Sequence, residues 1–245
     1  MKDSADRGVA VVIGAGGGLG AALVRQASQN GQIDGSSGAY QRVLPLGRHT
    51  QPLLDYTDEA SLAAAARWVA AQCAESGAEL RLLVVASGFL HGEPGQPERS
   101  FNHLDAIYLQ HVFAINTIGP ALVMKHFFPL LPKTGRCVAG FVSARVGSIG
   151  DNVLGGWYGY RASKAALNQL VKTASIELTR RNRESICVAL HPGTVDTSLS
   201  QPFAKTGLKV RPPDEAARDL LVVLDGLAPS DTGSLLDYRG QRLPF

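Results

Sequence analysis

The stretch GGWYGYRASKAALNQL, residues 155–170, brings a phenol and an ammonium together. Tyr160 lies four positions before Lys164, and this spacing puts both side chains on one face of a helix. Such a pair suits proton transfer to a carbonyl oxygen while the carbonyl carbon receives a hydride. The ordinary pKa of a tyrosine is about 10. A neighbouring ammonium and a cationic cofactor ring nearby favour the phenolate, so we expect a lowered pKa for Tyr160. Tyr158 misses this spacing and is expected to be a packing or substrate-loop aromatic.

A glycine-rich run, IGAGGGLG, follows the apolar stretch 9–13 and precedes a predicted helix that begins at Leu19. Glycine permits positive φ and close approach of the backbone to a pyrophosphate, and a helix N-terminus offers N–H groups to the anion. Two patterns fit: GxxxGxG through Gly14, Gly18 and Gly20, or GxGxxA through Gly16, Gly18 and Ala21, which leaves Gly14 without a role. With a strand before it and a helix after it, the run predicts dinucleotide binding.

The remaining elements must position these two features. Apolar runs predict strands at 9–13, 43–46, 80–87, 136–143 and 186–193, with a short one near 233–238. Helices are predicted at about 19–29, from Thr57 as N-cap to 73, and at about 104–128, 161–180 and 214–224. This alternation predicts an α/β fold, a doubly wound parallel sheet of the Rossmann-like kind with helices on both faces. We expect residues 1–245 to form one domain, with ligands at the carboxyl ends of the strands.

Composition excludes several function classes. The chain has 245 residues, 45% of them hydrophobic, and a formal net charge of +3, too small to indicate a nucleic-acid or membrane partner. No run was expected to be long and apolar enough to span a membrane, and no signal peptide is visible. Three cysteines without a CxxC pair indicate reduced thiols in the cytoplasm. The six histidines form no metal-binding motif, so no metal site is predicted.

The end of the second strand indicates which dinucleotide binds. An acidic residue there would bind the ribose hydroxyl of NAD, whereas an arginine would pair with the 2′-phosphate of NADP. The sequence reads LPLGRH, with Gly47 and Arg48 and no carboxylate. NADP(H) is therefore favoured over NAD(H), and a plain surface arginine is the alternative.

The GxxxGxG run and the YxxxK pair, which follows a strand that ends in serine, make the chain resemble the short-chain dehydrogenases/reductases over nearly its whole length. The resemblance implies that Asn116 holds a water that links Lys164 to solvent; a simple buried hydrogen bond is the alternative. It implies that Asp55 lies beside the adenine, where a turn role is the alternative. It also implies cofactor contacts from Leu19, from Gly88 in SGF, and from the turn HPGTVDT: Pro192, Gly193, Thr194, Val195 and Thr197.

One position departs from the family pattern. The family's catalytic serine lies three residues before a glycine, and counting back from Gly147 gives Ala144. Ser143 lies one residue earlier and would face the other side of an extended strand unless the backbone bulges. We predict Ser143 as the catalytic serine, with Ser148 as a second candidate. Losing this hydrogen-bond donor commonly costs roughly 3 kcal/mol, or about a hundredfold in rate.

The segments SARVGSIGDN, HPGTVDTSLSQPF and GQRLPF are similar to a narrower branch, the C-factor and Sniffer-like carbonyl reductases. This branch implies NADPH-dependent reduction of an aldehyde or ketone, and the residues about 198–213 are predicted to form the substrate lid. The resemblance also implies a homodimer or homotetramer. The alternative function is a dinucleotide-binding sensor or signalling protein with little turnover, which Ala144 supports and the retained Tyr160 and Lys164 oppose.

Overall fold

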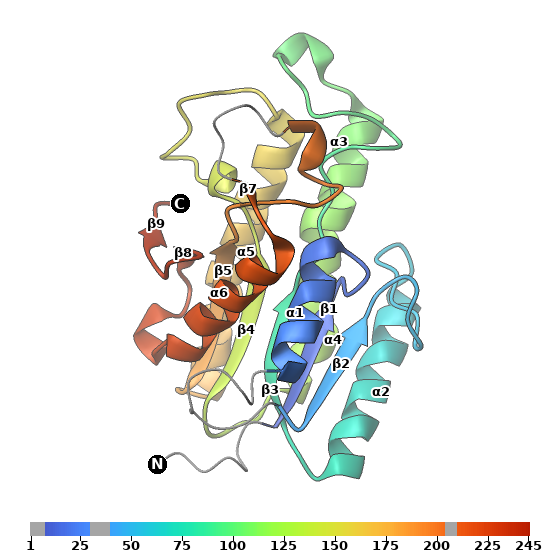
Figure 1. Cartoon of the computed structure of the whole chain (residues 1–245), viewed down its shortest axis with the longest axis vertical. Helices are drawn as coiled ribbons and strands as arrows, with labels where there is room; N and C mark the ends of the chain where they lie inside the picture. The colour runs from blue at the N-terminus through green and yellow to red at the C-terminus, as the bar shows by residue number, and fades with distance from the viewer. Residues whose placement is uncertain (1–7, 30–39, 204–209) are drawn as a thin grey trace.

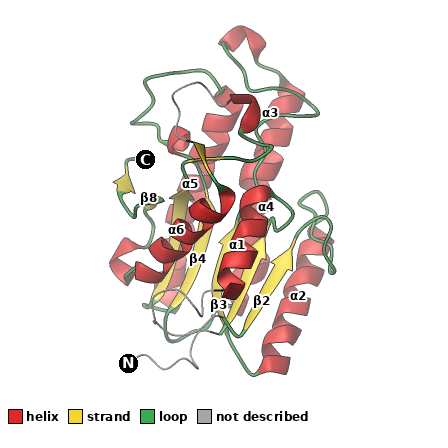
Figure 2. Cartoon of the chain, in the orientation of Figure 1, coloured by secondary structure: helices red, strands yellow, loops and turns green. Residues whose placement is uncertain are grey.

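The computed structural model describes residues 8–29, 40–203 and 210–245. Figures 1 and 2 show one twisted sheet between two layers of helices. Its strand order is β2-β1-β3-β4-β5-β8-β9, and all neighbours are parallel except the last pair. The strands are β1 (Val9–Ile13), β2 (Arg42–Leu46), β3 (Leu80–Val85), β4 (Cys137–Val142), β5 (Ser185–His191), β8 (Leu235–Asp237) and β9 (Arg242–Leu243). A separate parallel pair joins β6 (Thr194–Val195) to β7 (Val210–Arg211).

The helices divide between the two faces of the sheet. Alternate residues of β1 pack on opposite sides: Ala10 and Val12 contribute to one core, and Val9, Val11 and Ile13 to the other. The first core is shared with α1 (Gly18–Gln29) and α6 (Pro213–Gly226), which lie side by side in Figure 1. The second is shared with α2 (Glu59–Ser76), α4 (Gly119–Phe127) and α5 (Tyr158–Arg181). The predicted single-domain, doubly wound α/β fold is confirmed.

One local prediction was wrong, and two features were not predicted. The N-cap of α2 is Asp58, whose side chain accepts the Ala60 N–H, while Thr57 instead donates to Asp55. The long helix predicted at 104–128 is confirmed as one helical run, Ala106–Leu130, but an unpredicted π-helical turn, Ala114–Ile118, separates α3 (Ala106–Phe113) from α4 within it. The antiparallel β9 was not predicted, because two residues carry no alternating pattern.

The run Ala106–Leu130 also corrects the expectation about membrane spans. By length and composition alone it could cross a membrane, since its most apolar window has a mean hydropathy of 1.3. Within the described residues, however, α4 packs against α2 and α5, and Val123 and Phe127 are fully buried in the core. Part of the apolar character of this helix therefore serves the interior of the domain, while Ile107 and Ile118 are exposed.

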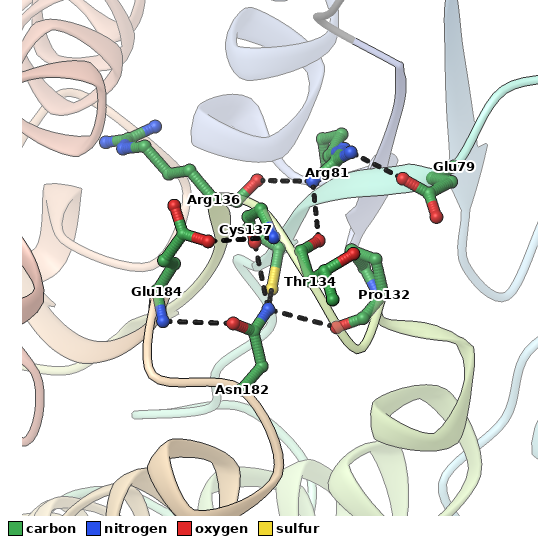
Figure 3. Close-up of polar contacts among 9 residues, drawn as sticks. Glu79, Arg81, Pro132, Thr134, Arg136, Cys137, Asn182 and Glu184 are labelled. Carbon is green, nitrogen blue, oxygen red and sulfur yellow. Dashed lines mark hydrogen bonds and ion pairs between the residues drawn. The ribbon is translucent and has the colours of Figure 1, made fainter.

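A polar network closes the amino ends of β3 and β4 (Figure 3). Asn182, the C-cap of α5, donates to the carbonyls of Pro132 and Gly135 at 3.1 and 2.9 Å. Glu184, two residues further on, accepts the Gly135 N–H at 3.0 Å. The C-terminal end of α5 is thereby fixed to the loop before β4, at the edge of the sheet opposite the candidate site.

Gly119 permits a close contact between α4 and the turn before α2, and its replacement should be costly. A Cβ at this position would lie 2.1 Å from the Tyr56 ring. We expect Gly119→Ala to lower the free energy of unfolding by about 1–3 kcal/mol, because the Tyr56 ring packs against the core and its hydroxyl is bonded to Ser87, so the added methyl group must displace a held side chain. Chemical denaturation measures the change. Gly226→Ala is the matched control, since a Cβ there has no neighbour within 4 Å; equal effects of the two substitutions would refute the steric explanation.

Candidate active site

A cleft of about 590 Å³ lies across the carboxyl ends of the strands. It begins beside the glycine-rich loop and β2, and ends between α5 and the turn after β5. Most of the predicted site residues line it: Gly14, Gly16, Gly18, Leu19, Arg48, Asp55, Gly88, Ser143, Tyr160, Lys164, Pro192, Gly193, Thr194, Val195 and Thr197. Gly20 and Asn116 do not line the cleft and lie behind the residues that do.

The glycine loop has the geometry of the GxxxGxG pattern. Gly14 has φ +87°, and a Cβ there would lie 2.7 Å from the Ser87 nitrogen. A Cβ at Gly20 would lie 2.1 Å from the Gly14 carbonyl oxygen, and one at Gly18 would lie 2.8 Å from the Thr197 side chain. Gly16, by contrast, faces open space. The three glycines of the GxxxGxG pattern are thus the ones that tight packing requires, whereas the alternative pattern leaves the most constrained glycine unexplained.

Arg48 and Asp55 lie at the β2 end of the cleft. Arg48 is exposed and lines the cleft together with Gly47 and His49. The Asp55 carboxylate accepts hydrogen bonds from the backbone N–H and hydroxyl of Thr57, at 2.9 and 2.8 Å. These bonds lower the pKa of Asp55, with a smaller contribution from Arg48. Asp55 therefore has the turn role that was left open, and it also faces the site.

The segment SGF, residues 87–89, follows β3 and lines the cleft. The Ser87 hydroxyl lies 2.5 Å from the Tyr56 hydroxyl. Gly88 follows, and a Cβ there would come within 3.7 Å of both Asn116 Oδ1 and Lys164 Nζ. Gly88 therefore lies within van der Waals reach of both the lysine and the asparagine.

Tyr160 and Lys164 lie on one face of the first turns of α5, and both are buried, at 8% and 2% exposure. The ammonium donates to the Val142 carbonyl at 2.9 Å and lies 5.9 Å from the centre of the Tyr160 ring. Burial raises the pKa of Tyr160 to about 12 and lowers that of Lys164 to about 8. Loss of solvent thus disfavours the phenolate in the ligand-free protein. The lowered pKa was expected with a cationic cofactor ring beside the phenol, and it stays a prediction.

Asn116 lies in the π-helical turn and is fully buried. Its amide oxygen accepts the Phe89 N–H, and its NH₂ group donates to the Phe89 carbonyl, both at 2.8 Å, and to Ser163 Oγ at 3.1 Å. These bonds match the buried hydrogen-bond role that is the alternative, and the water that would link Lys164 to solvent stays a prediction. Asn116 joins the loop after β3 to α5, one residue before Lys164.

The candidates for the catalytic serine differ in what they can donate. Ser143 borders the cleft, but its hydroxyl donates to Asn168 Oδ1 at 2.7 Å. Its backbone N–H continues the ladder from β4 to β5, so the strand has no bulge at this point. Ser148 is buried, outside the cleft lining, and its hydroxyl accepts the Asp151 N–H. Ala144 lines the cleft between them, at the family's serine position.

The turn after β5 carries the second group of predicted cofactor contacts. Gly193 has φ +78°, and the chain then enters β6, where Val195 pairs with Arg211 of β7. The Arg211 guanidinium is buried, forms ion pairs with Glu215 and Asp219 of α6, and packs 4.0 Å from the Tyr238 ring. This arginine was missed from the sequence. It fixes the backbone of the turn from behind, since its Cδ lies close to Gly193.

An aromatic group around Tyr160 was also missed. Trp157 lines the cleft, with its ring 6.1 Å from that of Tyr160 and 5.1 Å from that of Phe203. On the opposite wall, Phe89 packs edge-on against His111 at 4.4 Å. The sequence carries only a weak signal for this aromatic group, the two glycines before Trp157. In the structure both glycines have positive φ. The described part of the predicted lid contributes Phe203; residues 204–209 lie outside the described residues.

The residues present fit a nicotinamide dinucleotide. The cradle formed by Gly14, Gly18 and Gly20 would be filled by any side chain, and it opens onto the N-terminus of α1, as a pyrophosphate requires. From this point the cleft extends to β2 in one direction and to Tyr160 in the other. Gly47, Arg48 and Asp55 would hold the adenosine end, and Lys164 and the turn after β5 the nicotinamide end.

Comparisons with known proteins agree with this geometry. The sequence profile of the short chain dehydrogenase family matches residues 8–207. The C-signal of Myxococcus xanthus is 36% identical over 142 residues, which cover 58% of this chain and 81% of that protein. The 1-hydroxy-2-glutathionyl-2-methyl-3-butene dehydrogenase of Rhodococcus sp. is 30% identical over 243 residues, 96% of this chain and 98% of that protein.

Among solved structures, the NADPH-bound carbonyl reductase from chicken fatty liver superposes with a TM-score of 0.81 at 26% identity, covering 98% of this chain and 99% of that one. The carbonyl reductase Sniffer of D. melanogaster has a TM-score of 0.80 at 20% identity, covering 98% and 100%, which shows a shared fold. The predicted resemblance to the family is confirmed: the chain belongs to the short-chain dehydrogenase family, has the C-signal among its relatives, and is an oxidoreductase that binds a nicotinamide dinucleotide and acts on a small molecule.

Proposed function

We propose that this protein is an NADPH-dependent carbonyl reductase that converts an aldehyde or ketone to the alcohol. The observation that carries the proposal is the buried pair Tyr160 and Lys164, which shares one cleft with the phosphate-binding glycine loop. Bound NADPH supplies the hydride to the carbonyl carbon. Tyr160 donates its phenol proton to the carbonyl oxygen, so that the product is neutral.

The chain's own residues support this proton transfer. The raised pKa of Tyr160 keeps the phenol protonated at neutral pH, as an acid must be before it reacts. The Lys164 ammonium holds the ribose side of the cofactor and stabilises the phenolate once the proton has left. Asn116, whose amide joins the loop of Phe89 to α5, keeps the lysine and tyrosine in register and supports the proton relay. Ser143 acts indirectly in this proposal. Its hydroxyl donates to Asn168, which lies one turn beyond Lys164 on α5.

The walls near Tyr160 favour an apolar carbonyl compound. This end of the cleft is lined by aromatic and aliphatic side chains: Trp157, Phe203, Phe89, Ile115 and Leu199. The arginine in the lining there, Arg145, is tied to Asp151 by an ion pair. These walls therefore offer little positive charge to bind a polyanionic substrate. We propose that the segment 198–213, which carries Leu199 and Phe203, is the substrate lid.

Arg48 is proposed to select NADPH over NADH. Its side chain is exposed at the β2 end of the cleft, where no carboxylate follows β2. We expect Arg48→Ala to raise the KM for NADPH about ten- to hundredfold, because it removes a charge-assisted hydrogen bond worth about 1.5–3 kcal/mol. The KM for NADH should change less than about threefold. Steady-state kinetics with both cofactors measure this, and equal losses with NADPH and NADH would show that Arg48 does not contact the 2′-phosphate.

We also propose a homodimer or homotetramer in the cytoplasm. Exposed apolar side chains on neighbouring helices, Ile107 of α3, Ile118 of the π-helical turn and Ile176 of α5, support association through this face. The buried thiols of Cys137 and Cys187 are unpaired, which suits a reducing compartment.

The test of the function is NADPH oxidation against a panel of aldehydes and ketones, with NADPH affinity measured separately by titration. We expect tight binding and turnover with apolar members of the panel. Ala144 favours one other candidate, a dinucleotide-binding sensor, because the family's serine donor is missing at this position. Binding of NADPH without turnover on any carbonyl would support the sensor and refute the reductase.

A further inference from the structure

The N-terminus of α5, which carries Tyr160, has no cap of its own. The residue before the helix is Trp157, with φ 54° and ψ 43°, and it makes no side-chain cap hydrogen bond. Among the described non-glycine residues it is the one with positive φ, a conformation that costs energy and must be held by its surroundings. Helices normally cap their first N–H groups with Ser, Thr, Asp or Asn, and an indole has no acceptor to offer.

Glu98 supplies the missing acceptor from a distant part of the chain. Both of its carboxylate oxygens lie 3.1 Å from the Gly159 nitrogen, whose N–H they accept. Its main-chain carbonyl accepts the Trp157 N–H at 2.6 Å. Glu98 belongs to the loop between β3 and α3, is 2% exposed, and lies 61 positions before Gly159 in sequence. A carboxylate at a helix N-terminus also complements the helix dipole.

The neighbouring residues are shaped around this carboxylate. A Cβ at Gly159 would lie 3.0 Å from Glu98 Oε1 and 2.9 Å from Leu109 Cδ2, so the close approach depends on glycine. Gly155 and Gly156, with φ +62° and +66°, turn the chain into the conformation that presents Trp157. The carbonyl of Trp157 then accepts the Arg161 N–H at 2.8 Å, and the first turn of α5 is closed.

We propose that Glu98 is a positioning residue for Tyr160: its buried carboxylate holds the first turn of α5 and so fixes where the phenol stands in the cleft. The inference rests on the proposed reductase function. Gly159, whose N–H the carboxylate accepts, directly precedes Tyr160 in the chain. The far end of α5 is fixed by Asn182 (Figure 3), and Glu98 fixes the end at which the chemistry occurs.

The experiment compares Glu98→Leu with Glu98→Gln, which keeps an acceptor oxygen of the same reach. We expect Glu98→Leu to lower kcat about ten- to hundredfold, because a displacement of about 1 Å at a reacting group costs about this much. The KM for NADPH should stay within about twofold, since the glycine loop is untouched, and Glu98→Gln should restore most of kcat. Hydrogen exchange of the peptide 155–163 should quicken in the Leu variant and stay near wild type in the Gln variant.

Glu184→Leu is the matched control. Its carboxylate also accepts a glycine N–H, that of Gly135, but at the other end of α5 and away from the cleft (Figure 3). We expect its kcat to equal that of the wild type. If Glu98→Leu does not fold, Gly159→Ala replaces it, because the added methyl would displace the same carboxylate.

The two readouts separate the possible failures. A wild-type protein without turnover would refute the reductase, while exchange of the peptide 155–163 would still report whether Glu98 caps the helix. Faster exchange with unchanged kcat would overturn the positioning role. Unchanged exchange in Glu98→Leu would overturn the cap itself, whatever happens to kcat.

Discussion

Tyr160→Phe should lower kcat for carbonyl reduction about 10²- to 10⁴-fold, the usual contribution of a general acid. The substitution removes the proton donor and leaves the ring, which packs against Trp157. The dissociation constant of NADPH should stay nearly unchanged, because the cofactor contacts expected from the glycine loop and Lys164 remain. Steady-state kinetics and a fluorescence titration with NADPH measure the two quantities.

Tyr158→Phe provides the control for this prediction. The same hydroxyl is removed two residues earlier, from a side chain that is 41% exposed and lies outside the cleft lining. We expect kcat to stay within about twofold of the wild type, since surface substitutions usually have small effects. Loss of turnover in Tyr158→Phe together with normal turnover in Tyr160→Phe would move the acid to the other tyrosine.

Ala144→Ser should raise kcat about ten- to a hundredfold, the opposite direction from most active-site substitutions. Ala144 lines the cleft with extended backbone at the strand end, so a serine hydroxyl there would face the carbonyl oxygen. One such donor is commonly worth roughly 3 kcal/mol of transition-state stabilisation, or about a hundredfold in rate, and this sets the upper end of the expected gain. The measurement is kcat on the best substrate of the panel at saturating NADPH.

The companion variant is Ser143→Ala. Its hydroxyl donates to Asn168, so its loss should change kcat less than about fivefold. A large loss here, with no gain from Ala144→Ser, would show that Ser143 turns toward the substrate during the reaction. Such a result would support the prediction that Ser143 is the catalytic serine.

The layout of the fold could be predicted because its signals are local. Buried strands such as Val9–Ile13 are continuous apolar runs, and the spacing of Tyr160 and Lys164 already places them on one helix face. The same holds for the glycine loop, whose three constrained positions match the GxxxGxG pattern. Each of these features lies within a few residues of chain.

Other features depend on contacts between distant segments. Glu98 reaches Gly159 across 61 positions, and Arg211 is buried by residues of α6 and by Tyr238. No periodicity reveals such partners. The pKa of Tyr160 is another case, because the spacing indicates the lysine but not the burial that raises this pKa in the ligand-free protein. The N-cap of α2 was placed one residue too early because Thr57 and Asp58 are both good caps. The Thr57 hydroxyl and N–H donate to Asp55, and Asp58 caps the helix.

The most direct test of the reductase is label transfer. The protein is incubated with NADPH that carries deuterium at C4 of the nicotinamide ring, in both stereochemical forms, together with an apolar aldehyde, and the alcohol is examined by mass spectrometry and NMR. We predict deuterium on the carbinol carbon from one of the two forms, in equal amount to the NADP⁺ produced, and a greatly slowed transfer in Tyr160→Phe. Tight binding of NADPH with no labelled alcohol from any carbonyl of the panel would contradict the account.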